Sequence, residues 1–454
     1  MFDIGIIGSG PAGYTAAIRA CQNGLSAVLF EKNQIGGTCL NKGCIPVKTI
    51  LNSCRIYSEL MNVNKFGIIA ENVNFDFTKI QQRQKTVSEK IRKSLTMLIK
   101  SYGIMIIEEE ANIVNEHIIS TKTGSYEVKN IIIATGSRPN ILKFKGNYSN
   151  DFVLTSDDIL NLTELPSSML IVGSGAIGIE WARILSSLNV KVSIVEIMEK
   201  LIPSADYEVS ERIARLLRKN KIDFYTSTSV QEIEGKTVTL SNKKILDVDF
   251  LLLGAGRTAE ICTGNIVNNL NKKQYINVDS NFKTNYNNIY AIGDVTGKSL
   301  LAHSAIKQAE SVINYIVSGK SREFNKNLVP SVIFGTPEIA SIGLTEQELI
   351  EQKIKYKKSF FPVSALGKAY ADDKIEGFIK ILATDDKILG AHIISEEASA
   401  LIEQIAIAMT NNIKPKELQN VIFAHPTYSE GVLESILALD NMAINLPKKT
   451  EVKT

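Results

Sequence analysis

The sequence of 454 residues contains few cysteines, and most of them lie far apart. Cys21, Cys39, Cys44, Cys54 and Cys262 form an odd, scattered set, which is not a disulfide framework. A structural zinc site would need four ligands at compact spacings, and there is no Cys-x-x-Cys, so we expect no metal site. Only two of the five, Cys39 and Cys44, are close in sequence. If that pair has a special role, the chemistry is redox chemistry.

Long apolar runs and blocks of like charge are also missing. No run reaches the roughly 18 apolar residues of a membrane-spanning helix, and the most apolar stretch, residues 169–179, is interrupted by glycines. The 51 basic and 48 acidic residues give a net charge of +3 without a basic block, so neither nucleic acid nor a membrane is an expected partner. The first expected strand begins at Phe2, which leaves no room for a leader segment. We therefore predict a cytoplasmic protein.

Two segments of the sequence follow one plan. Each has a short apolar strand, a Gly-x-Gly-x-x-Gly turn, a helix and a second strand that ends in a glutamate, and that glutamate lies 23 residues after the first glycine in both. The defining residues are Gly8, Gly10, Gly13 and Glu31 in the first segment, and Gly173, Gly175, Gly178 and Glu196 in the second.

This plan has a physical reason in dinucleotide binding. The first glycine makes a tight turn, the second lets the backbone approach a pyrophosphate, and the third lets helix and strand pack closely. The helix N-terminus offers free N–H groups to the phosphates, and the glutamate accepts a hydrogen bond from a ribose hydroxyl. Two copies predict two dinucleotides. At the second site Glu196 would repel the 2′-phosphate of NADP and no arginine follows directly, so we expect NAD; Lys200 could soften this preference.

The cysteine pair lies in the stretch G-G-T-C-L-N-K-G-C-I-P-V-K at residues 36–48. A separation of five residues at a helix start predicts two sulfurs on one turn and one face. Pro46 fits the first turn of a helix, and a helix N-terminus favours the thiolate form of a cysteine. Disulfide exchange proceeds by thiolate attack through a mixed disulfide, so one sulfur must face the substrate.

This stretch resembles the G-G-T-C-x-N-x-G-C-[IV]-P-[ST]-K signature of the class I pyridine nucleotide–disulfide oxidoreductases. The resemblance extends over nearly the whole chain, through A-T-G-S-R-P at 134–139, Y-A-I-G-D at 290–294, L-A-H at 301–303, L-G-A-H-I at 389–393 and A-H-P-T-Y-S-E at 424–430. It implies FAD and NAD as cofactors. Within the family, the chain most resembles members that oxidise protein-bound dihydrolipoamide to lipoamide with NAD⁺ as acceptor.

The resemblance also implies roles for single residues. Cys39 would be the interchange thiol and Cys44 the charge-transfer thiol beside the flavin. Lys48 would lie near the flavin and pair with Glu180, a carboxylate at an otherwise apolar helix start that needs a partner. Asp294 would hold the ribityl chain of FAD. The other expected cofactor-site residues are Thr135, Gly136, Ala302, Val230 and Gly256.

A histidine completes the predicted site. Oxidation of a dithiol needs a base, and histidine is the side chain whose ordinary pKa suits that task near neutral pH. Of the four histidines, His425 is the candidate, with Glu430 orienting its other ring nitrogen. By resemblance this histidine acts on the active site of the partner subunit, which implies a homodimer.

Two positions depart from the family pattern. Val47 replaces the usual Ser or Thr, and Phe423 stands where members acting on lipoamide commonly have a second histidine. One alternative is therefore an NAD(P)H-dependent reductase of another small disulfide such as glutathione, although such enzymes usually hold NADP through arginines. Another alternative is a non-catalytic flavoprotein subunit. The expected partner is a lipoyl-bearing protein of a 2-oxo acid dehydrogenase or glycine-cleavage complex; the sequence does not say which.

We predict an α/β fold with two Rossmann-like dinucleotide-binding domains and a C-terminal α+β interface domain that forms the dimer. The FAD-binding domain would comprise residues 1–145 and 263–327, the NAD-binding domain residues 146–262, and the interface domain residues 328–454. In the interface domain we expect strands at 332–334, 377–382 and 389–394 and a helix at 398–409. A polar helix around residues 80–100 should be solvated. Cys21, Cys54 and Cys262 should be structural.

Overall fold

The computed structural model describes residues 1–261, 270–321 and 323–447. The chain divides into two units, each made of several segments. Unit 1 comprises Met1–Lys143, Val153–Leu165 and Ala255–Lys326, and unit 2 comprises Phe144–Phe152, Pro166–Gly254 and Asn327–Thr454. Cys262 lies outside the described residues, so its expected structural role stays a prediction, as does the division into three domains.

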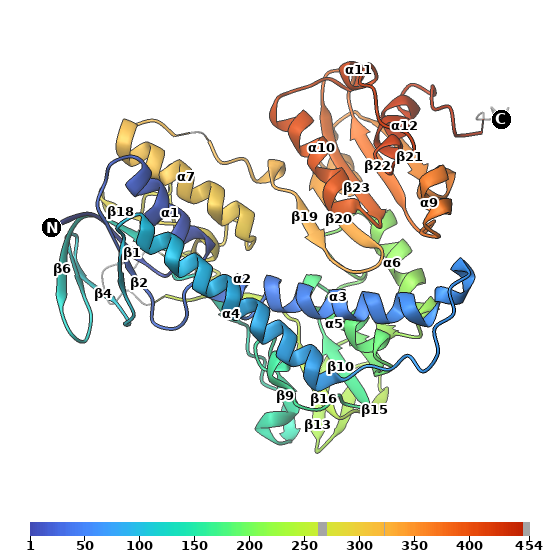
Figure 1. The fold of residues 1–454 in the computed structure, drawn as a ribbon, viewed down its shortest axis with the longest axis horizontal. Coiled ribbons are helices and arrows are strands. Elements are labelled where there is room, and N and C mark those ends of the chain that lie inside the picture. Colours follow the sequence, from blue (N-terminus) through green and yellow to red (C-terminus); the bar gives the residue numbers. More distant parts are fainter. Residues whose placement is uncertain (262–269, 322, 448–454) are drawn as a thin grey trace. The chain divides into compact units, whose positions relative to one another are not determined.

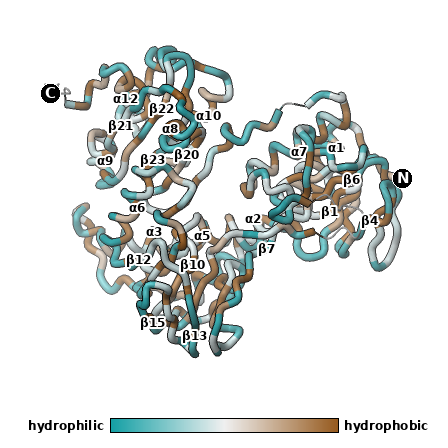
Figure 2. The backbone as a smooth tube through the Cα atoms, turned by 180° about the vertical axis from the view of Figure 1, so that it is seen from behind, coloured by the Kyte–Doolittle hydropathy of each residue, from teal (hydrophilic) through white to brown (hydrophobic). Residues whose placement is uncertain are grey.

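Unit 1 is built on a sheet with the strand order β3-β2-β1-β6-β5-β4, with β18 pairing β6. Strands β1, β2, β3, β6 and β18 run parallel, and β4 and β5 add an antiparallel edge. Strand β1 and residues 131–133 of β6 are mostly apolar and buried, and brown marks the tube around β1 in Figure 2. The strands are β1 (Phe2–Ile7), β2 (Ala27–Phe30), β3 (Met105–Ile107), β4 (Asn112–Asn115), β5 (Ile118–Ser120), β6 (Ser125–Ile133) and β18 (Ile289–Ala291).

Helices α1 and α7 of unit 1 pack side by side against the sheet, as Figure 1 shows, because alanines on α1 allow a close approach. Helix α3, which begins at Cys44, packs against α4. Two short strands, β7 and β17, form an antiparallel pair. The remaining elements of unit 1 are α1 (Pro11–Gln22), α2 (Gly37–Asn41), α3 (Cys44–Met61), α4 (Phe77–Ser101), β7 (Ser137–Pro139), β9 (Val153–Leu154), β17 (Arg257–Ala259) and α7 (Ala302–Ser318), with short 3₁₀ turns at Val63–Phe66, Ile159–Asn161 and Gly293–Thr296.

Unit 2 repeats the nucleotide-binding plan. Its parallel strands follow the order β12-β11-β10-β16, and β15-β14-β13-β8 form a separate small sheet. The elements are β8 (Lys145–Asn147), β10 (Ser168–Val172), α5 (Ala176–Ser187), β11 (Lys191–Val195), α6 (Tyr207–Lys219), β12 (Asp223–Tyr225), β13 (Val230–Glu234), β14 (Thr237–Leu240), β15 (Ile245–Asp247) and β16 (Phe250–Leu253).

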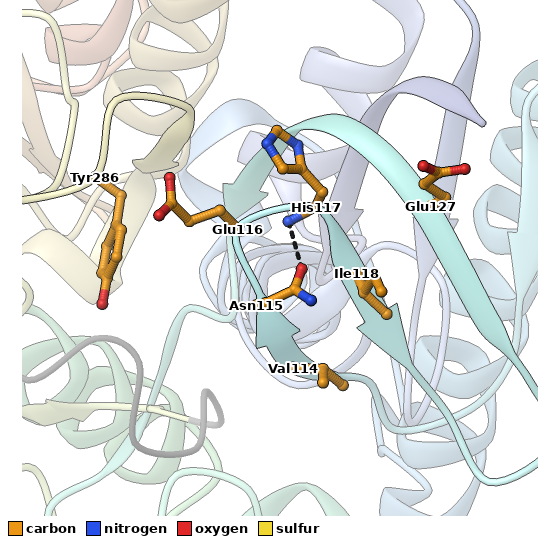
Figure 3. Close-up of a pocket in the computed structure, with 7 residues that line it drawn as sticks. All are labelled: Val114, Asn115, Glu116, His117, Ile118, Glu127 and Tyr286. Carbon is orange, nitrogen blue, oxygen red and sulfur yellow. Dashed lines mark hydrogen bonds between the residues drawn. The ribbon is translucent and has the colours of Figure 1, made fainter.

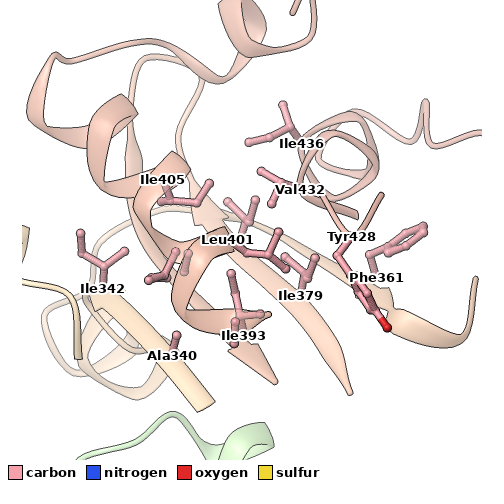
Figure 4. Packing of buried hydrophobic residues seen from close by; sticks show 14 of the residues in the cluster. Ala340, Ile342, Phe361, Ile379, Ile393, Leu401, Ile405, Tyr428, Val432 and Ile436 are labelled. Atoms are coloured by element: carbon pink, nitrogen blue, oxygen red, sulfur yellow. The ribbon is translucent and has the colours of Figure 1, made fainter. Parts of the chain in front are cut away.

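The C-terminal part of unit 2 is an antiparallel sheet with the order β19-β20-β23-β22-β21. Isoleucines of β22 and β23 face apolar residues of α10 and α12, as Figure 4 shows for Ile379, Ile393, Leu401 and Val432. Helix α8 packs against the opposite face through Leu349. The elements are β19 (Ser331–Ile333), β20 (Glu338–Gly343), α8 (Glu346–Glu351), β21 (Lys357–Pro362), α9 (Gly367–Ala371), β22 (Phe378–Ala383), β23 (Ile388–Ser395), α10 (Ala398–Thr410), α11 (Pro415–Leu418) and α12 (Glu430–Ala438).

The predicted fold class is confirmed, with two Rossmann-like units and a C-terminal α+β domain. The expected strands and helix of the C-terminal domain are present, but the sequence pattern did not reveal β20, β21 and α12. The long helix α4 is mostly exposed, as expected, yet it buries Gln81, Gln84 and Ser88, which lie on one face. In the part of the chain that the structure describes, no helix is long and apolar enough to cross a membrane.

Candidate active site

The first glycine turn of unit 1 is shaped by contacts that only glycine tolerates. Gly8 has a φ of +101°, and a Cβ there would lie 2.3 Å from the carbonyl oxygen of Ala134. A Cβ on Gly13 would lie 1.8 Å from the carbonyl oxygen of Gly8, so the third glycine lets α1 start directly over the strand. Around Gly10, by contrast, the nearest atom to a Cβ would be 4.0 Å away. The helix N-terminus is therefore approachable at its second glycine.

Glu31 is buried behind this turn and is held by its neighbours. One carboxylate oxygen, Oε2, accepts hydrogen bonds from the backbone N–H of Ser9 at 3.0 Å and from its hydroxyl at 2.6 Å. The other oxygen, Oε1, accepts the N–H of Asn33 at 2.8 Å. A carboxylate has about four acceptor sites, so roughly one remains for a ligand hydroxyl. The predicted ribose acceptor is thus fixed in place, by a serine whose role the sequence pattern did not reveal.

The second glycine turn, in unit 2, repeats this arrangement. Gly173 has a φ of +100°, a Cβ on Gly178 would lie 2.0 Å from the carbonyl oxygen of Gly173, and around Gly175 the space is open. Glu196 Oε2 accepts the backbone N–H and the hydroxyl of Ser174 at 2.8 and 2.7 Å. Its Oε1 accepts the N–H of Met198 at 3.0 Å.

Both turns fit a dinucleotide. Each has an open glycine at the N-terminus of a helix of 12 residues, where unpaired N–H groups favour a pyrophosphate. Each has a buried glutamate with acceptor capacity left for a ribose. No arginine occurs in residues 197–202 after Glu196, and the side chain of Lys200 turns instead to the carbonyl oxygen of Ala205. These residues suit NAD better than NADP at the second turn.

The cysteines lie on two helices rather than on one turn. Cys39 belongs to the short helix α2, and Cys44 is the first residue of α3. The expectation of one shared helical turn is wrong, because Lys42 and Gly43 interrupt the helix and Gly43 has a backbone conformation outside the helical region. The thiols are nevertheless neighbours: a hydrogen bond to the Cys44 thiol, followed by burial, raises the pKa of Cys39, while the Lys48 ammonium opposes the shift.

Asn41 ties the cysteine segment to its surroundings. Its side-chain NH₂ group donates to the carbonyl oxygens of Ile35 and Gly37, both at 3.0 Å, and its own oxygen accepts from Arg92 of α4 at 3.2 Å. The motif contained this asparagine, but sequence reasoning gave it no role. Because the segment is anchored on both sides, the Cys39 thiol has a defined position.

Of the remaining predicted residues of unit 1, Thr135, Gly136 and Asp294 come shortly after the parallel strands β6 and β18. Asp294 accepts a 2.5 Å hydrogen bond from the Ser137 hydroxyl, and Arg257 donates to the same hydroxyl at 2.8 Å. Burial raises the pKa of Asp294, although Ser137 and Arg257 oppose the rise. Thr135 donates to the carbonyl oxygen of Glu260 at 2.5 Å. Gly136 has a φ of +77°, Gly256 has a φ of +85°, and Ala302 is the first residue of α7.

Two further predicted residues lie in unit 2. Glu180 is buried in α5, and its Oε1 accepts the N–H of Phe334 at 3.0 Å. Arg183, one turn further along, is half-buried; burial lowers its pKa to about 10, while the charge of Glu180 opposes this. Val230 begins β13. Lys48 belongs to unit 1, and its pairing with Glu180 stays a prediction.

His425 and Glu430 form a hydrogen-bonded pair in unit 2. His425 Nδ1 lies 2.8 Å from Glu430 Oε1, and the other carboxylate oxygen accepts the N–H of Thr427 at 2.8 Å. Burial alone would raise the pKa of Glu430, but the hydrogen bonds from His425 and Thr427 hold it below its ordinary value. The carboxylate therefore stays ionised and favours a proton on Nδ1. Nε2 of this exposed imidazole is then the nitrogen that can take a proton.

The other three histidines have different surroundings. His392 is buried and His303 is exposed. His117 is exposed and lines a shallow pocket with Glu116, Glu127 and Tyr286 (Figure 3). In that view the side chains of Glu116 and Tyr286 approach the hollow from different segments. The pocket contains none of the predicted site residues.

Comparison with known proteins places these features in a family. Residues 2–309 match the family described as pyridine nucleotide-disulphide oxidoreductase, and residues 329–436 match its dimerisation domain. The chain belongs to this family. The C-terminal α+β domain is thus a dimerisation domain, and the protein is an oxidoreductase whose family uses a pyridine nucleotide and a disulfide.

Relatives of known name span the whole chain. The dihydrolipoyl dehydrogenase of Bacillus subtilis is 36% identical over 98% of this chain and 99% of its own length, and that of Trypanosoma brucei brucei is 33% identical over 98% of each. Among solved structures, the HOCl-induced flavoprotein disulfide reductase RclA from Escherichia coli is 26% identical, with a TM-score of 0.86 over 96% of this chain and 99% of that one. LpdA from Mycobacterium tuberculosis, at 22% identity, shares the fold with a TM-score of 0.89 over 97% of this chain and 100% of that one.

Proposed function

We propose that this protein oxidises protein-bound dihydrolipoamide to lipoamide with NAD⁺ as acceptor. The observation that carries the proposal is the Cys39–Cys44 dithiol, with Cys39 in α2 and Cys44 at the start of α3, in a chain that also contains two dinucleotide turns. Full-length similarity to dihydrolipoyl dehydrogenases at 32–36% identity supports lipoamide over other disulfides. The predicted cytoplasmic location and the lipoyl-bearing partner are part of this proposal.

The thiol chemistry follows from the cysteine pair. In the oxidised enzyme the two sulfurs form a disulfide; a thiolate of dihydrolipoamide attacks Cys39 Sγ, the S–S bond breaks, and Cys44 departs as thiolate. The second substrate thiol then attacks the mixed disulfide, which releases lipoamide and leaves Cys39 reduced. Two electrons have moved from substrate to cysteines. FAD, when bound at the first turn, supplies the relay of that electron pair to NAD⁺.

Proton handling is assigned to His425. Its Nε2 accepts the proton of the attacking substrate thiol, and Glu430 stabilises the resulting imidazolium through the hydrogen bond at Nδ1. By family resemblance the histidine serves the cysteines of the partner subunit, which fits the dimerisation domain at residues 329–436. Lys48, whose charge opposes the rise in the pKa of Cys39, favours the thiolate of the pair.

The cofactor residues divide between the turns. FAD would be held by the N-terminus of α1, Glu31, Thr135, Gly136, Asp294 and Ala302, and NAD by the N-terminus of α5, Glu196, Val230 and Gly256. The support is the open glycine and the fixed carboxylate at each turn. The three predicted domain ranges also remain part of the proposal.

A steady-state comparison of substrates tests this function. Purified protein with bound flavin is assayed with lipoamide, glutathione disulfide and related disulfides, each with NADH and with NADPH. We expect NADH-driven reduction of lipoamide to be at least about tenfold faster per unit substrate than any other combination, because Glu196 rejects a 2′-phosphate and the dithiol suits a cyclic disulfide. Faster turnover of glutathione disulfide with NADPH would refute the proposal.

A further inference from the structure

A lysine is completely buried in the antiparallel sheet of the dimerisation domain, the dimerisation sheet (β19-β20-β23-β22-β21), and the proposed chemistry does not use it. Lys380 lies in the middle of β22, where its neighbours Ile379 and Ile381 face α10 and α12. Because side chains alternate along a strand, Lys380 points to the opposite face, the face that packs against α8 and α6. Its side chain has no solvent exposure.

The Lys380 ammonium contacts three carboxylates from two elements. It donates to Asp206 Oδ1 at 2.8 Å, to Glu346 Oε2 at 2.6 Å, and to Glu208. Burying a charge is costly unless it is paired and hydrogen-bonded, and here the pairing is complete. Burial alone would lower the pKa of Lys380, but the three carboxylates raise it, so the ammonium is retained. Burial meanwhile lowers the pKa of nearby His392, which lies 3.8 Å from Asp206.

Asp206, the first of these partners, ends the segment that follows the predicted ribose acceptor. It is the N-cap residue of α6, it is fully buried, and its second oxygen accepts the backbone N–H of Glu346 at 2.9 Å. The preceding carbonyl, that of Ala205, accepts from the side chain of Gln347 at 2.9 Å. Residues of β22 and α8 therefore hold the end of the 197–205 segment.

The same segment is also bonded to the nucleotide turn. Ile202 donates its N–H to the Ser174 hydroxyl at 3.0 Å, and that hydroxyl donates to Glu196 at 2.7 Å. Ala205 donates its own N–H to the carbonyl oxygen of Ile202 at 2.8 Å. Hydrogen bonds, joined by the backbone at Ala205–Asp206 and across Ile202, thus connect Lys380 through Asp206 and the 197–205 segment to the carboxylate of Glu196.

From this path we infer that Lys380 is a positioning residue for the pyridine nucleotide, acting from the dimerisation domain on the adenosine-ribose end of the site. The inference rests on the proposed NAD site at the second glycine turn. Fixing the 197–205 segment keeps Ser174 and Glu196 ready for the ribose. When the segment is released, its ordering must be supplied by the ligand, and affinity falls.

ADP-ribose is the probe, because it carries the adenosine half of the nucleotide and cannot accept a hydride. Its dissociation constant is measured by titration calorimetry on the full-length flavin-containing dimer. For Lys380→Met we expect the dissociation constant to be about tenfold larger, because one hydrogen bond to a charged group contributes on that scale. Reduction of the enzyme by dihydrolipoamide without NAD should keep its wild-type rate, because the thiol step does not use this path.

Two further variants separate positioning from loss of structure. Gln347→Leu removes only the bond to the Ala205 carbonyl and should weaken ADP-ribose severalfold even if Lys380→Met does not fold. Glu376→Gln breaks partly exposed ion pairs with Arg212 at 3.7 Å and with Lys219, the last residue of α6, at 2.8 Å; neither pair contacts the 197–205 segment, so ADP-ribose binding should be unchanged.

The outcomes are distinct. An ADP-ribose dissociation constant within about twofold of wild type in Gln347→Leu, and in Lys380→Met if it folds, overturns the positioning role even if thermal stability falls. A wild-type protein that binds no ADP-ribose and shows no NADH-dependent activity refutes the proposed function instead.

Discussion

The two glycine turns of this chain are near copies, but the segments beyond their glutamates differ. In both turns, a serine between the first two glycines bonds the glutamate through its N–H and its hydroxyl, at closely similar distances. In both, the first glycine donates to the last residue of the second strand at 2.8 Å. From the first glycine to the glutamate the two copies have the same spacing.

After the glutamate the two segments are used differently. In unit 1 the Ser9 hydroxyl also accepts a hydrogen bond from the N–H of Gly36 at 3.2 Å. Gly36 lies at the beginning of the segment that carries Cys39 and Cys44. In unit 2 the Ser174 hydroxyl accepts a hydrogen bond from the N–H of Ile202 at 3.0 Å. Ile202 belongs to the segment that ends at Asp206, where Lys380 donates a hydrogen bond. One turn is thus coupled to a redox pair and the other to the dimerisation sheet.

The difference teaches that the turn itself specifies only a dinucleotide. The chemistry depends on the segment after the glutamate, which the serine hydroxyl also binds. Substitutions in the segments beyond the glutamates should therefore affect the chemistry, and substitutions in the turns should affect the binding of one cofactor each.

The largest effect is expected from the redox loop. Cys44→Ser removes the sulfur that must leave when a substrate thiolate attacks Cys39, so lipoamide turnover should fall to background while the protein keeps its flavin absorbance. Steady-state assays and a visible spectrum measure both. Cys54→Ser, at a buried cysteine of the same helix α3, should retain turnover. Wild-type lipoamide activity in Cys44→Ser would mean that the pair is not the redox centre.

Much of this architecture could be predicted from the sequence, because its signals are local. Glycine spacing, apolar strands and the acid at residues 31 and 196 follow from backbone geometry, and they predicted both turns. The family motif identified the cysteines, although the helix break at Gly43 was missed because a single glycine does not announce whether a helix continues. The pair of His425 and Glu430 was predicted because the chemistry needs a base and a carboxylate that orients it, and the two side chains are hydrogen-bonded at 2.8 Å.

The features that the sequence did not reveal depend on residues far apart along the chain. Lys380 and Asp206 are 174 residues apart, and a lysine in an otherwise apolar strand gives no sign of its partners. Ser9 and Ser174 occupy variable positions of the glycine pattern, so their bonds to the glutamates appear only in three dimensions. The Arg257–Ser137–Asp294 contacts are hidden for the same reason.

Substitution of the glutamate in either turn should have an intermediate effect, and only on the cofactor of that turn. Glu31→Gln and Glu196→Gln each keep the side-chain shape but remove the charge and present an NH₂ group among donors. We expect Glu31→Gln to weaken FAD about tenfold without changing the KM for NAD, and Glu196→Gln to raise the KM for NAD about tenfold without flavin loss. Glu196→Gln should also narrow the preference for NAD over NADP. Flavin content after dialysis and KM values for NAD and NADP test this. Flavin loss in Glu196→Gln, or a raised KM for NAD in Glu31→Gln, would contradict the assignment of the turns.

The smallest effect should show whether each serine serves its turn alone or also its loop. Ser9→Ala and Ser174→Ala remove one hydroxyl that bonds both the glutamate and the loop, so each should weaken its own cofactor by about threefold, the scale of one net hydrogen bond. Ser9 also holds Gly36, three residues before Cys39. Ser9→Ala should therefore slow enzyme reduction by dihydrolipoamide, measured by stopped-flow absorbance with saturating FAD, whereas Ser174→Ala should not. Equal rates in both variants would mean that the redox loop is positioned by Asn41 without help from the turn.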